Sequence, residues 1–264
     1  MSPRPRGGFT LVEILVVILI IGLLVGLVIP GLRLAMQAMD STTCLSNMRQ
    51  IALAMANYGA DNKVLAGNAF EADPVKHPPW ITVTADAQGK QTIGGVLYKY
   101  VETNPRVFIC PTLKADTDVG GDKVACHYAI PTILSGMPPE YMRDGFYRDA
   151  THKLPGVPIV VEPQVYAVRN AGGNITSISN SLGVYDYQAT RTWTTLPNGA
   201  FEGGNVLDRR RHYGRMHMAF ANGTAGAFNF DVDEVAASDL FLTLANGTQM
   251  NMGGHNQWED WSRR

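Results

Sequence analysis

The chain has 264 residues, enough for one or two domains, and its 22 Lys and Arg residues nearly balance its 23 Asp and Glu residues. The formal net charge of -1 provides no overall field of the kind that attracts nucleic acid or an acidic partner. Partners must therefore be sought in local features, and the first of these is a concentration of apolar residues near the N-terminus.

An apolar segment begins a few residues into the chain and has no charged or polar side chain from residue 14 to residue 29. Counted from Phe9, it makes a helix about 30 Å long, enough to cross a bilayer. A secretory signal peptide would show a small-residue cleavage site after the apolar run, whereas here Pro30 leads directly into an amphipathic pattern. The sequence therefore predicts a retained membrane helix, and the preceding Arg4 and Arg6 predict a cytoplasmic N-terminus.

The residues GGFTLVE (7–13) join a short basic leader to this helix. Their combination of glycine, aromatic residue and carboxylate resembles the class III signal of type IV pilins and type II secretion pseudopilins. The resemblance implies that a prepilin peptidase cuts after Gly8 and that the new N-terminal residue, Phe9, is methylated. It also implies a single-pass protein of the bacterial inner membrane, with a periplasmic C-terminal domain, that enters a periplasmic pseudopilus or a surface pilus.

Glu13 stands at the edge of the apolar run, where ionised groups are costly and usually functional. In the family that the motif resembles, the amine of Phe9 in a neighbouring subunit could pair with Glu13 and neutralise it. This hypothesis makes Glu13 an assembly residue. The alternative is that its side chain extends to the cytoplasmic interface near the start of the helix.

Glycine and proline residues interrupt the apolar run at several points. Gly22 and Gly26 lie four residues apart on one helical face, a spacing that permits close helix packing in a membrane. The alternative is the general tolerance of membrane helices for glycine. Pro30 removes a backbone hydrogen bond and Gly31 adds backbone freedom, which predicts a kink or local melting of the helix.

Beyond Gly31, apolar residues recur at intervals of three and four, which predicts an amphipathic helix to about residue 57 with Gly59 as its C-terminal cap. The segment CLSNMRQIALAMANYGADNKV (44–64) resembles the helix end of pilin-like proteins known from planctomycetes and related bacteria. The predicted organisation is a leader peptide (1–8), a long N-terminal helix (9–61) with a transmembrane and assembly segment (9–30), and a C-terminal globular domain (62–264).

The globular part has short apolar runs separated by Gly, Pro, Asn and Thr, which indicates strands and long loops. The clearest hairpin is RMHMAFANGTAGAFNF (215–230), in which Asn222-Gly223 is a two-residue turn signal. An antiparallel sheet packed on the second half of the long helix is expected, the α+β fold of a pilin, with a surface loop at 189–205. The other predicted strands are 80–84, 106–110, 124–130, 157–162 and 182–188.

The segment RRRHYGRMHMAFANG resembles a further feature of those pilin-like proteins, a histidine followed after nine residues by Asp-Gly. His212 matches the histidine, but Asn222 stands where Asp is usual. A tight turn accepts Asn equally well, which favours a structural role for this position. A local basic patch, interpreted as a solvated face with DNA or acidic-polymer binding as the alternative, comprises Arg209, Arg210, Arg211 and Arg215.

Three cysteines, Cys44, Cys110 and Cys126, lie in a domain that the predicted topology places outside the cytoplasm, where disulfides form. Cys44 with Cys110 is the preferred pair, because it would tie the exposed helix to the sheet where the family resemblance places cysteines. Cys110 with Cys126 is the rival. Zinc binding by the cysteines is not expected, because no paired, closely spaced set of Cys or His residues appears beyond the adjacent Cys126 and His127. These two neighbours would point to opposite faces of a strand, which also disfavours a Cys–His catalytic dyad.

The sequence has no Walker loop, GxSxG elbow, HExxH pair or dinucleotide fingerprint, so we expect a protein that is not an enzyme and has no cofactor. An acidic cluster near the C-terminus could hold calcium, because hard oxygen ligands suit that ion, as in some pseudopilins. The competing interpretation is a solvated turn before a helix start near Ser238. The weak calcium candidates are Asp231, Asp233 and Glu234, with Asp239 nearby.

The sequence as a whole predicts a structural subunit that polymerises through its N-terminal helix. The expected partners are copies of itself, other pilins or pseudopilins, the prepilin peptidase and the inner-membrane assembly platform, with nucleic acid not expected. A type II secretion pseudopilus and a type IV pilus are both compatible with the motif. The alternative class is a membrane-anchored periplasmic binding module, or an enzyme, that does not polymerise.

Overall fold

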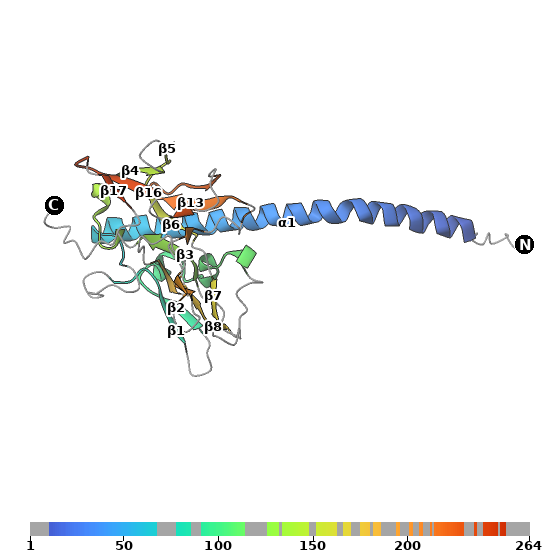
Figure 1. The fold of residues 1–264 in the computed structure, drawn as a ribbon, viewed down its shortest axis with the longest axis horizontal. Coiled ribbons are helices and arrows are strands. Elements are labelled where there is room, and N and C mark those ends of the chain that lie inside the picture. Colours follow the sequence, from blue (N-terminus) through green and yellow to red (C-terminus); the bar gives the residue numbers. More distant parts are fainter. Residues whose placement is uncertain are drawn as a thin grey trace, which may run out of the picture. The chain divides into compact units, whose positions relative to one another are not determined.

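The first element of the computed structural model is a long helix, α1 (Leu11–Asn62) (Figure 1). The chain forms two compact units, Met1–Asp40 and Ser41–Arg264, which are described separately below. The structure describes residues 11–67, 78–85, 91–113, 126–131, 134–147, 152–162, 166–169, 175–179, 182–185, 194–195, 201–202, 206–207, 212, 214–229, 235–236, 240–247 and 249–251.

The C-terminal end of α1 is set by backbone geometry at Lys63. Lys63 adopts a left-handed conformation with a φ of 66°, and its N–H donates to the Gly59 carbonyl oxygen at 2.8 Å. The amide of Asn62 also donates to the Tyr58 carbonyl oxygen at 2.9 Å, so the last turn is well supplied with donors. The prediction that Gly59 caps the helix was wrong, because Gly59 is a buried residue inside the last turn.

The helix is continuous through Pro30, so the local melting considered from the sequence is not present there. A proline removes one backbone hydrogen bond, and the intact turns on both sides hold the helical dihedral angles. The kink that Pro30 and Gly31 suggest stays a prediction.

A five-stranded sheet forms the centre of the Ser41–Arg264 unit. Its strand order is β14-β13-β6-β3-β9, and the neighbours are antiparallel except for the parallel pair β3 and β9. Strands β3, β6 and β13 lie beside the C-terminal part of α1 and are buried along their whole length (Figure 1). The bounds are β3 (Cys126–Pro131), β6 (Pro158–Val161), β9 (Leu182–Tyr185), β13 (Met216–Phe220) and β14 (Ala225–Phe228).

A second, antiparallel sheet has the order β17-β16-β4-β5, and four shorter pairs complete the described strands. The members of the second sheet are β4 (Met142–Tyr147), β5 (His152–Lys153), β16 (Leu240–Leu244) and β17 (Gln249–Asn251). The shorter antiparallel pairs are β1 (Thr82–Ala85) with β2 (Gln91–Gly94), β7 (Tyr166–Arg169) with β8 (Ile175–Ser179), β10 (Thr194–Thr195) with β11 (Phe201–Glu202), and β12 (Val206–Leu207) with β15 (Val235–Ala236).

The core of this unit lies between the second half of α1 and the sheet. Cys44, Met48, Ile51 and Met55 recur at intervals of three and four and are at most 1% exposed, as the amphipathic pattern predicted. Large buried side chains from the rest of the unit pack with them in one cluster, among them Trp80, Phe108, Tyr128 and Phe220. The predicted α+β class, with a long apolar N-terminal helix and antiparallel sheets in a globular part, is therefore confirmed.

Four of the five additional strand predictions correspond to strands, namely β1, β3, β6 and β9. The fifth was wrong, because Pro105–Phe108 forms a 3-10 helix, η2. The Asn104 side chain accepts a hydrogen bond from the Arg106 N–H at 3.1 Å, and Pro105 supplies a φ suited to a helical start. The other described 3-10 helices are η1 (Tyr98–Val101), η3 (Pro111–Leu113) and η5 (Pro139–Tyr141).

The hairpin of β13 and β14 has a three-residue turn rather than the two-residue turn predicted from Asn222-Gly223. Ala219 pairs with Ala225, the Phe220 N–H donates to the Thr224 carbonyl oxygen at 2.9 Å, and Gly223 has a φ of 78°. A glycine in the left-handed region is the usual third residue of such a turn. The expected loop at 189–205 also contains β10 and β11, so that prediction was wrong for its described residues.

Candidate functional site

The first candidate site is the exposed apolar part of α1. Among the described residues, α1 is long and apolar enough to cross a membrane, and the apolar window that qualifies it has none of its residues buried. Every side chain from residue 11 to residue 36 is exposed. An apolar surface of this extent marks contact with lipid or with other apolar helices.

Glu13 lies in the first turn of α1 and is exposed. A carboxylate in the first turn interacts favourably with the helix macrodipole. Glu13 can therefore stabilise the helix even in a single chain. Gly8 and Phe9, the predicted cleavage and methylation residues, lie outside the described residues.

The glycines of this segment have open space around them. A Cβ atom added at Gly22, Gly26 or Gly31 would meet no other atom within 4 Å. Nothing within the described single chain therefore requires glycine at these three positions. A partner helix that approaches closely would require it.

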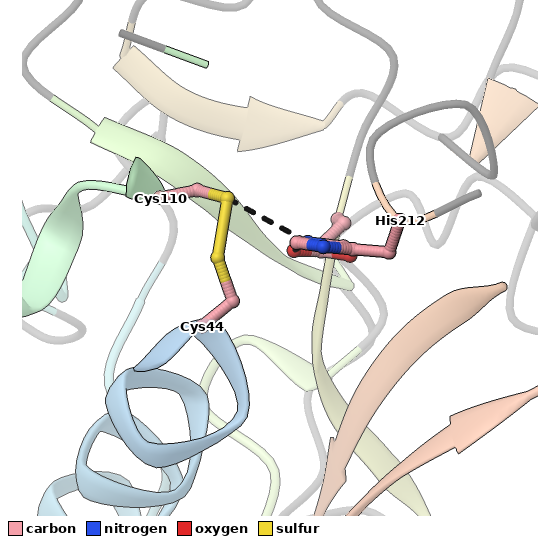
Figure 2. A group of neighbouring side chains, drawn as sticks. Cys44, Cys110 and His212 are labelled. Atoms are coloured by element: carbon pink, nitrogen blue, oxygen red, sulfur yellow. Dashed lines mark hydrogen bonds and ion pairs between the residues drawn. A yellow bond between two sulfur atoms is a disulfide. The ribbon is translucent and has the colours of Figure 1, made fainter. Parts of the chain in front are cut away.

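The second candidate site surrounds a disulfide in the core. Cys44 of α1 and Cys110, which follows η2, are joined by a disulfide, and their Cα atoms lie 5.3 Å apart. This is the pair that the family resemblance implied, and Cys126 is buried outside the bond. The ring of His212 points at the sulfur atoms, with its Nε2 atom 3.6 Å from Cys110 Sγ (Figure 2). The disulfide thus links the long helix to the globular fold at a buried polar centre.

A buried carboxylate lies at this centre. Glu162, the residue after β6, is fully buried, and its Oε1 atom accepts a hydrogen bond from His212 Nε2 at 3.0 Å. Its Oε2 atom lies 3.6 Å from Nδ1 of His217, which is on β13. The imidazole rings of His212 and His217 stack with their centroids 3.8 Å apart. Two imidazoles thus face one carboxylate, which compensates for its removal from water.

Ser41 extends this network to the helix. Its Oγ atom is hydrogen-bonded to His217 Nε2 at 3.0 Å. Ser41, His217 and Glu162 therefore occur in the order of a serine–histidine–acid relay. Acyl transfer also needs oxyanion donors and room for a substrate. Ser41 lies within α1, whose interior N–H groups already serve the helix, so we interpret the contact as structural.

A cavity of about 320 Å³ lies elsewhere in the same unit. Its lining includes Gly59, Pro139 and Glu140, and it contains none of the residues of the polar centre. Most of the exposed lining is apolar, and its charged residues are Lys63 and Glu140.

The two signature positions have separate roles in the structure. His212 belongs to the polar centre, whereas Asn222 lies in the hairpin turn. Asn222 Oδ1 accepts from the Thr224 N–H at 3.1 Å, and its amide donates to the Pro155 carbonyl oxygen at 2.9 Å. The structural role expected for Asn222 therefore agrees with its contacts.

Sequence reasoning missed three residues of the polar centre: Ser41, Glu162 and His217. Glu162 follows a run of apolar strand residues, and a lone acidic residue beside a buried strand is the signal that could have identified it. His127 is also buried, and its Nδ1 accepts from the Cys110 N–H at 3.0 Å. The prediction that Cys126 and His127 do not act as a pair is compatible with this separate contact.

Other predicted sites fall outside the described residues. These are the calcium candidates Asp231, Asp233 and Glu234, and three of the four patch arginines, Arg209, Arg210 and Arg211. Arg215 is described and exposed.

Comparison with protein families gave a match at the N-terminal end of the chain. Residues 3–29 match the family described as the prokaryotic N-terminal methylation motif. The match covers the leader from residue 3, the glycine, aromatic and carboxylate positions, and the apolar run to residue 29. It confirms the resemblance to a class III prepilin signal. No curated protein and no solved structure matches the chain. The finer resemblance to the planctomycete group stays a prediction.

The motif and the helix together define the class of the N-terminal segment. A prepilin-type methylation motif followed by a membrane-length helix is consistent with membrane anchoring and with a pilin or pseudopilin precursor. The motif points to a family of structural proteins.

Proposed function

We propose that this protein is the precursor of a structural filament subunit. It is cut after Gly8, methylated on the new N-terminal Phe9, and polymerised through its N-terminal helix into a pilus or a type II secretion pseudopilus. The observation that carries the proposal is the methylation motif at residues 3–29 joined to an apolar helix that is exposed throughout residues 11–36. A membrane covers this surface before assembly, and neighbouring helices cover it in the filament.

The helix has features suited to both environments. In this proposal, Glu13 pairs with the cationic amine of Phe9 from a neighbouring subunit, which would neutralise both charges in an apolar environment. Gly22 and Gly26 leave open space on the helix, and a neighbouring helix could approach closely there. The partners in this proposal are the prepilin peptidase, the inner-membrane assembly platform, copies of this chain and other subunits of the same type.

The Ser41–Arg264 unit is the displayed part of the subunit in this proposal, located in the periplasm or at the cell surface. Within this unit, the Cys44–Cys110 disulfide and the Ser41–His217 hydrogen bond join the C-terminal part of α1 to the rest of the fold. Force on the filament would then reach the folded unit through a covalent bond. In this proposal, the unit presents its surface on the filament and has no catalytic role.

The assembly step can be tested by changing Glu13 in the native cell. We expect Glu13→Gln, which keeps the shape and removes the charge, to be cleaved normally and to stay in the membrane. Its amount in sheared or cross-linked filaments should fall about 10-fold or more, the effect of losing about 1.4 kcal/mol per contact. The matched control is Glu102→Gln, at an exposed position of the displayed unit, which should assemble as the wild type does.

Two outcomes would contradict the proposal. Normal entry of Glu13→Gln into filaments would remove the pairing role of Glu13. A wild-type chain that is found only as a membrane monomer, with no cross-linked neighbours of its own type, would instead support an anchored periplasmic binding module.

A further inference from the structure

Four potential metal ligands meet at the disulfide. Cys44 Sγ, Cys110 Sγ, a Glu162 carboxylate oxygen and a His212 ring nitrogen all lie within 4.8 Å of one another, and all four residues are buried. They come from four separate segments: α1, the residues between η2 and η3, the end of β6, and the residue that precedes β13 by four positions. Figure 2 shows the His212 ring aimed at the two sulfur atoms.

Two of the distances among these atoms are equal or close to those of a tetrahedral zinc site. Zinc binds sulfur at about 2.3 Å and imidazole nitrogen at about 2.05 Å, so tetrahedral ligands of these two kinds lie about 3.5 Å apart. The distance from Cys110 Sγ to His212 Nε2 is 3.6 Å. A carboxylate oxygen and an imidazole nitrogen on the same ion would be separated by about 3.4 Å. Glu162 Oε1 and His212 Nε2 are 3.0 Å apart, so a shift of a few tenths of an ångström would suffice.

We propose that the reduced form of this protein binds one Zn²⁺ ion through Cys44, Cys110, Glu162 and His212. Two thiolates, one imidazole and one carboxylate form a ligand set that zinc accepts in four-coordinate sites. Reduction must let the sulfur atoms separate to about 3.8 Å, the distance between two thiolates on one tetrahedral zinc ion. The disulfide and the bound metal therefore exclude one another.

Burial explains why an ion would be retained. Two thiolates and a carboxylate removed from water are costly unless a cation compensates for them, and Zn²⁺ supplies two positive charges at their centre. Contacts around the ligands also hold them in place, as is usual for metal sites. His217 Nδ1 lies 3.6 Å from Glu162 Oε2, and the Cys110 N–H donates to His127 Nδ1 at 3.0 Å.

The site would direct which cysteines pair. Zinc would hold Cys44 and Cys110 together in a newly made chain, whereas Cys126 is outside the set, with its thiol donating to the Tyr128 carbonyl oxygen at 3.3 Å. Oxidation by a disulfide-bearing oxidant then forms the Cys44–Cys110 bond. The two thiolates give up two electrons, the oxidant's disulfide becomes two thiols by taking these electrons and two protons from water, and Zn²⁺ leaves unchanged in oxidation state.

The test compares the reduced and oxidised full-length protein in detergent micelles. Zn²⁺ is titrated against a chromophoric chelator, with a phosphine present to keep the reduced sample reduced. The proposal predicts one Zn²⁺ per reduced chain, bound at least 100-fold more tightly than by the oxidised chain. Co²⁺ added to the reduced chain should give the intense visible bands of a tetrahedral site together with thiolate charge-transfer absorption. Equal Zn²⁺ affinity in both forms, or a Co²⁺ spectrum without thiolate bands, would overturn the proposal.

Variants identify the ligands. Cys126→Ser should leave the Zn²⁺ affinity of the reduced chain unchanged, whereas Glu162→Gln and His212→Gln should each weaken it 10-fold or more. Loss of binding in Cys126→Ser, with the Glu162 and His212 variants unaffected, would overturn the assignment. The comparison of the two redox forms of the wild type does not depend on whether a variant folds.

Discussion

Glu162 Oε1 and His212 Nε2 lie 3.0 Å apart in the core, although 50 residues separate them in the sequence. The contact joins the end of β6 to the residue that leads towards β13, and these two strands are neighbours in the central sheet. His212 is therefore an internal support of the fold. It lies beside the disulfide that links α1 to the segment between η2 and η3, so a change at either residue should affect the stability of the unit.

Removing the charge of Glu162 should destabilise the Ser41–Arg264 unit. In Glu162→Gln, the amide replaces an ionised acceptor that faces two imidazoles, so we expect the free energy of unfolding to fall by about 2 kcal/mol. Urea unfolding of the full-length protein in detergent, followed by tryptophan fluorescence, measures this change. Glu140→Gln, at an exposed position, is the matched control and should stay within about 0.5 kcal/mol of the wild type. Equal stability of the two variants would contradict the supporting role of Glu162.

The Cys44–Cys110 bond should contribute strongly to stability. It closes a long loop, with a sequence separation of 66 residues, and a chain-entropy argument gives about 4 kcal/mol for its removal. Cys110→Ala should therefore lower the free energy of unfolding by that order, whereas Cys126→Ala should cost about 1 kcal/mol or less. Non-reducing peptide mapping of the wild type should recover the Cys44 and Cys110 peptides linked. Recovery of Cys110 linked to Cys126 would show the rival pairing.

Gly59 is expected to resist substitution although it lies in a helix. A Cβ atom there would lie 2.9 Å from Pro139 Cγ and 3.3 Å from Leu65 Cδ2. Alanine would gain about 1 kcal/mol of helix propensity, but overpacking costs about 1–3 kcal/mol, so we expect net destabilisation of Gly59→Ala by about 1 kcal/mol. Gly31→Ala, with nothing within 4 Å of the added atom, is the control. A stabilised Gly59→Ala would show that the helix and η5 can move apart at little cost.

The contact between Tyr100 and Asp61 should depend on pH. The Tyr100 hydroxyl donates to Asp61 Oδ2 at 2.8 Å, and this hydrogen bond, with a smaller contribution from burial, raises the pKa of Tyr100 above 10.0. A raised folded-state pKa means that the stabilisation is fully present below the unfolded pKa near 10 and is lost as pH rises through the folded value. Phenolate absorbance of the wild type minus that of Tyr100→Phe isolates this titration. Asp61→Asn should lower the Tyr100 pKa, and an unchanged value would contradict the assignment.

The turn residue Asn222 should not be replaceable by aspartate without a loss of stability. Aspartate keeps the acceptor for Thr224 but cannot donate to the Pro155 carbonyl oxygen, as the Asn222 amide does at 2.9 Å. We expect Asn222→Asp to lose about 1 kcal/mol of stability in the same unfolding assay. Asn229→Asp, at an exposed position after β14, should have no comparable effect. Stabilisation by Asn222→Asp would indicate that the turn, and not the contact to Pro155, dominates this position.

Local patterns predicted the parts of the fold that depend on neighbouring residues. The three-and-four spacing of Met48, Ile51 and Met55 identified the buried face of the helix, and the Asn222-Gly223 pair located the hairpin. The 3-10 helix η2 was missed because Val107 and Phe108 favour strands, although Asn104 and Pro105 carry a helix-start signal.

The polar centre could not be predicted, because it depends on contacts between distant segments. Ser41 and His217 are 176 residues apart, and no periodic pattern brings them together. The sequence identified His212 through a motif and Cys44 and Cys110 through their residue type. Glu162, the carboxylate near them, is a single charged residue after an apolar strand. Its role is visible only in the fold, where the position of β6 brings it to His212.

The most direct test of the proposed function is the intact mass and N-terminal sequence of the protein from native membranes and from sheared surface material. If the protein is a filament subunit, the sheared material or cross-linked pseudopilus assemblies should contain a chain that begins at N-methylated Phe9 and lacks residues 1–8. An unmethylated chain that still begins at Met1 in every fraction would contradict the proposal.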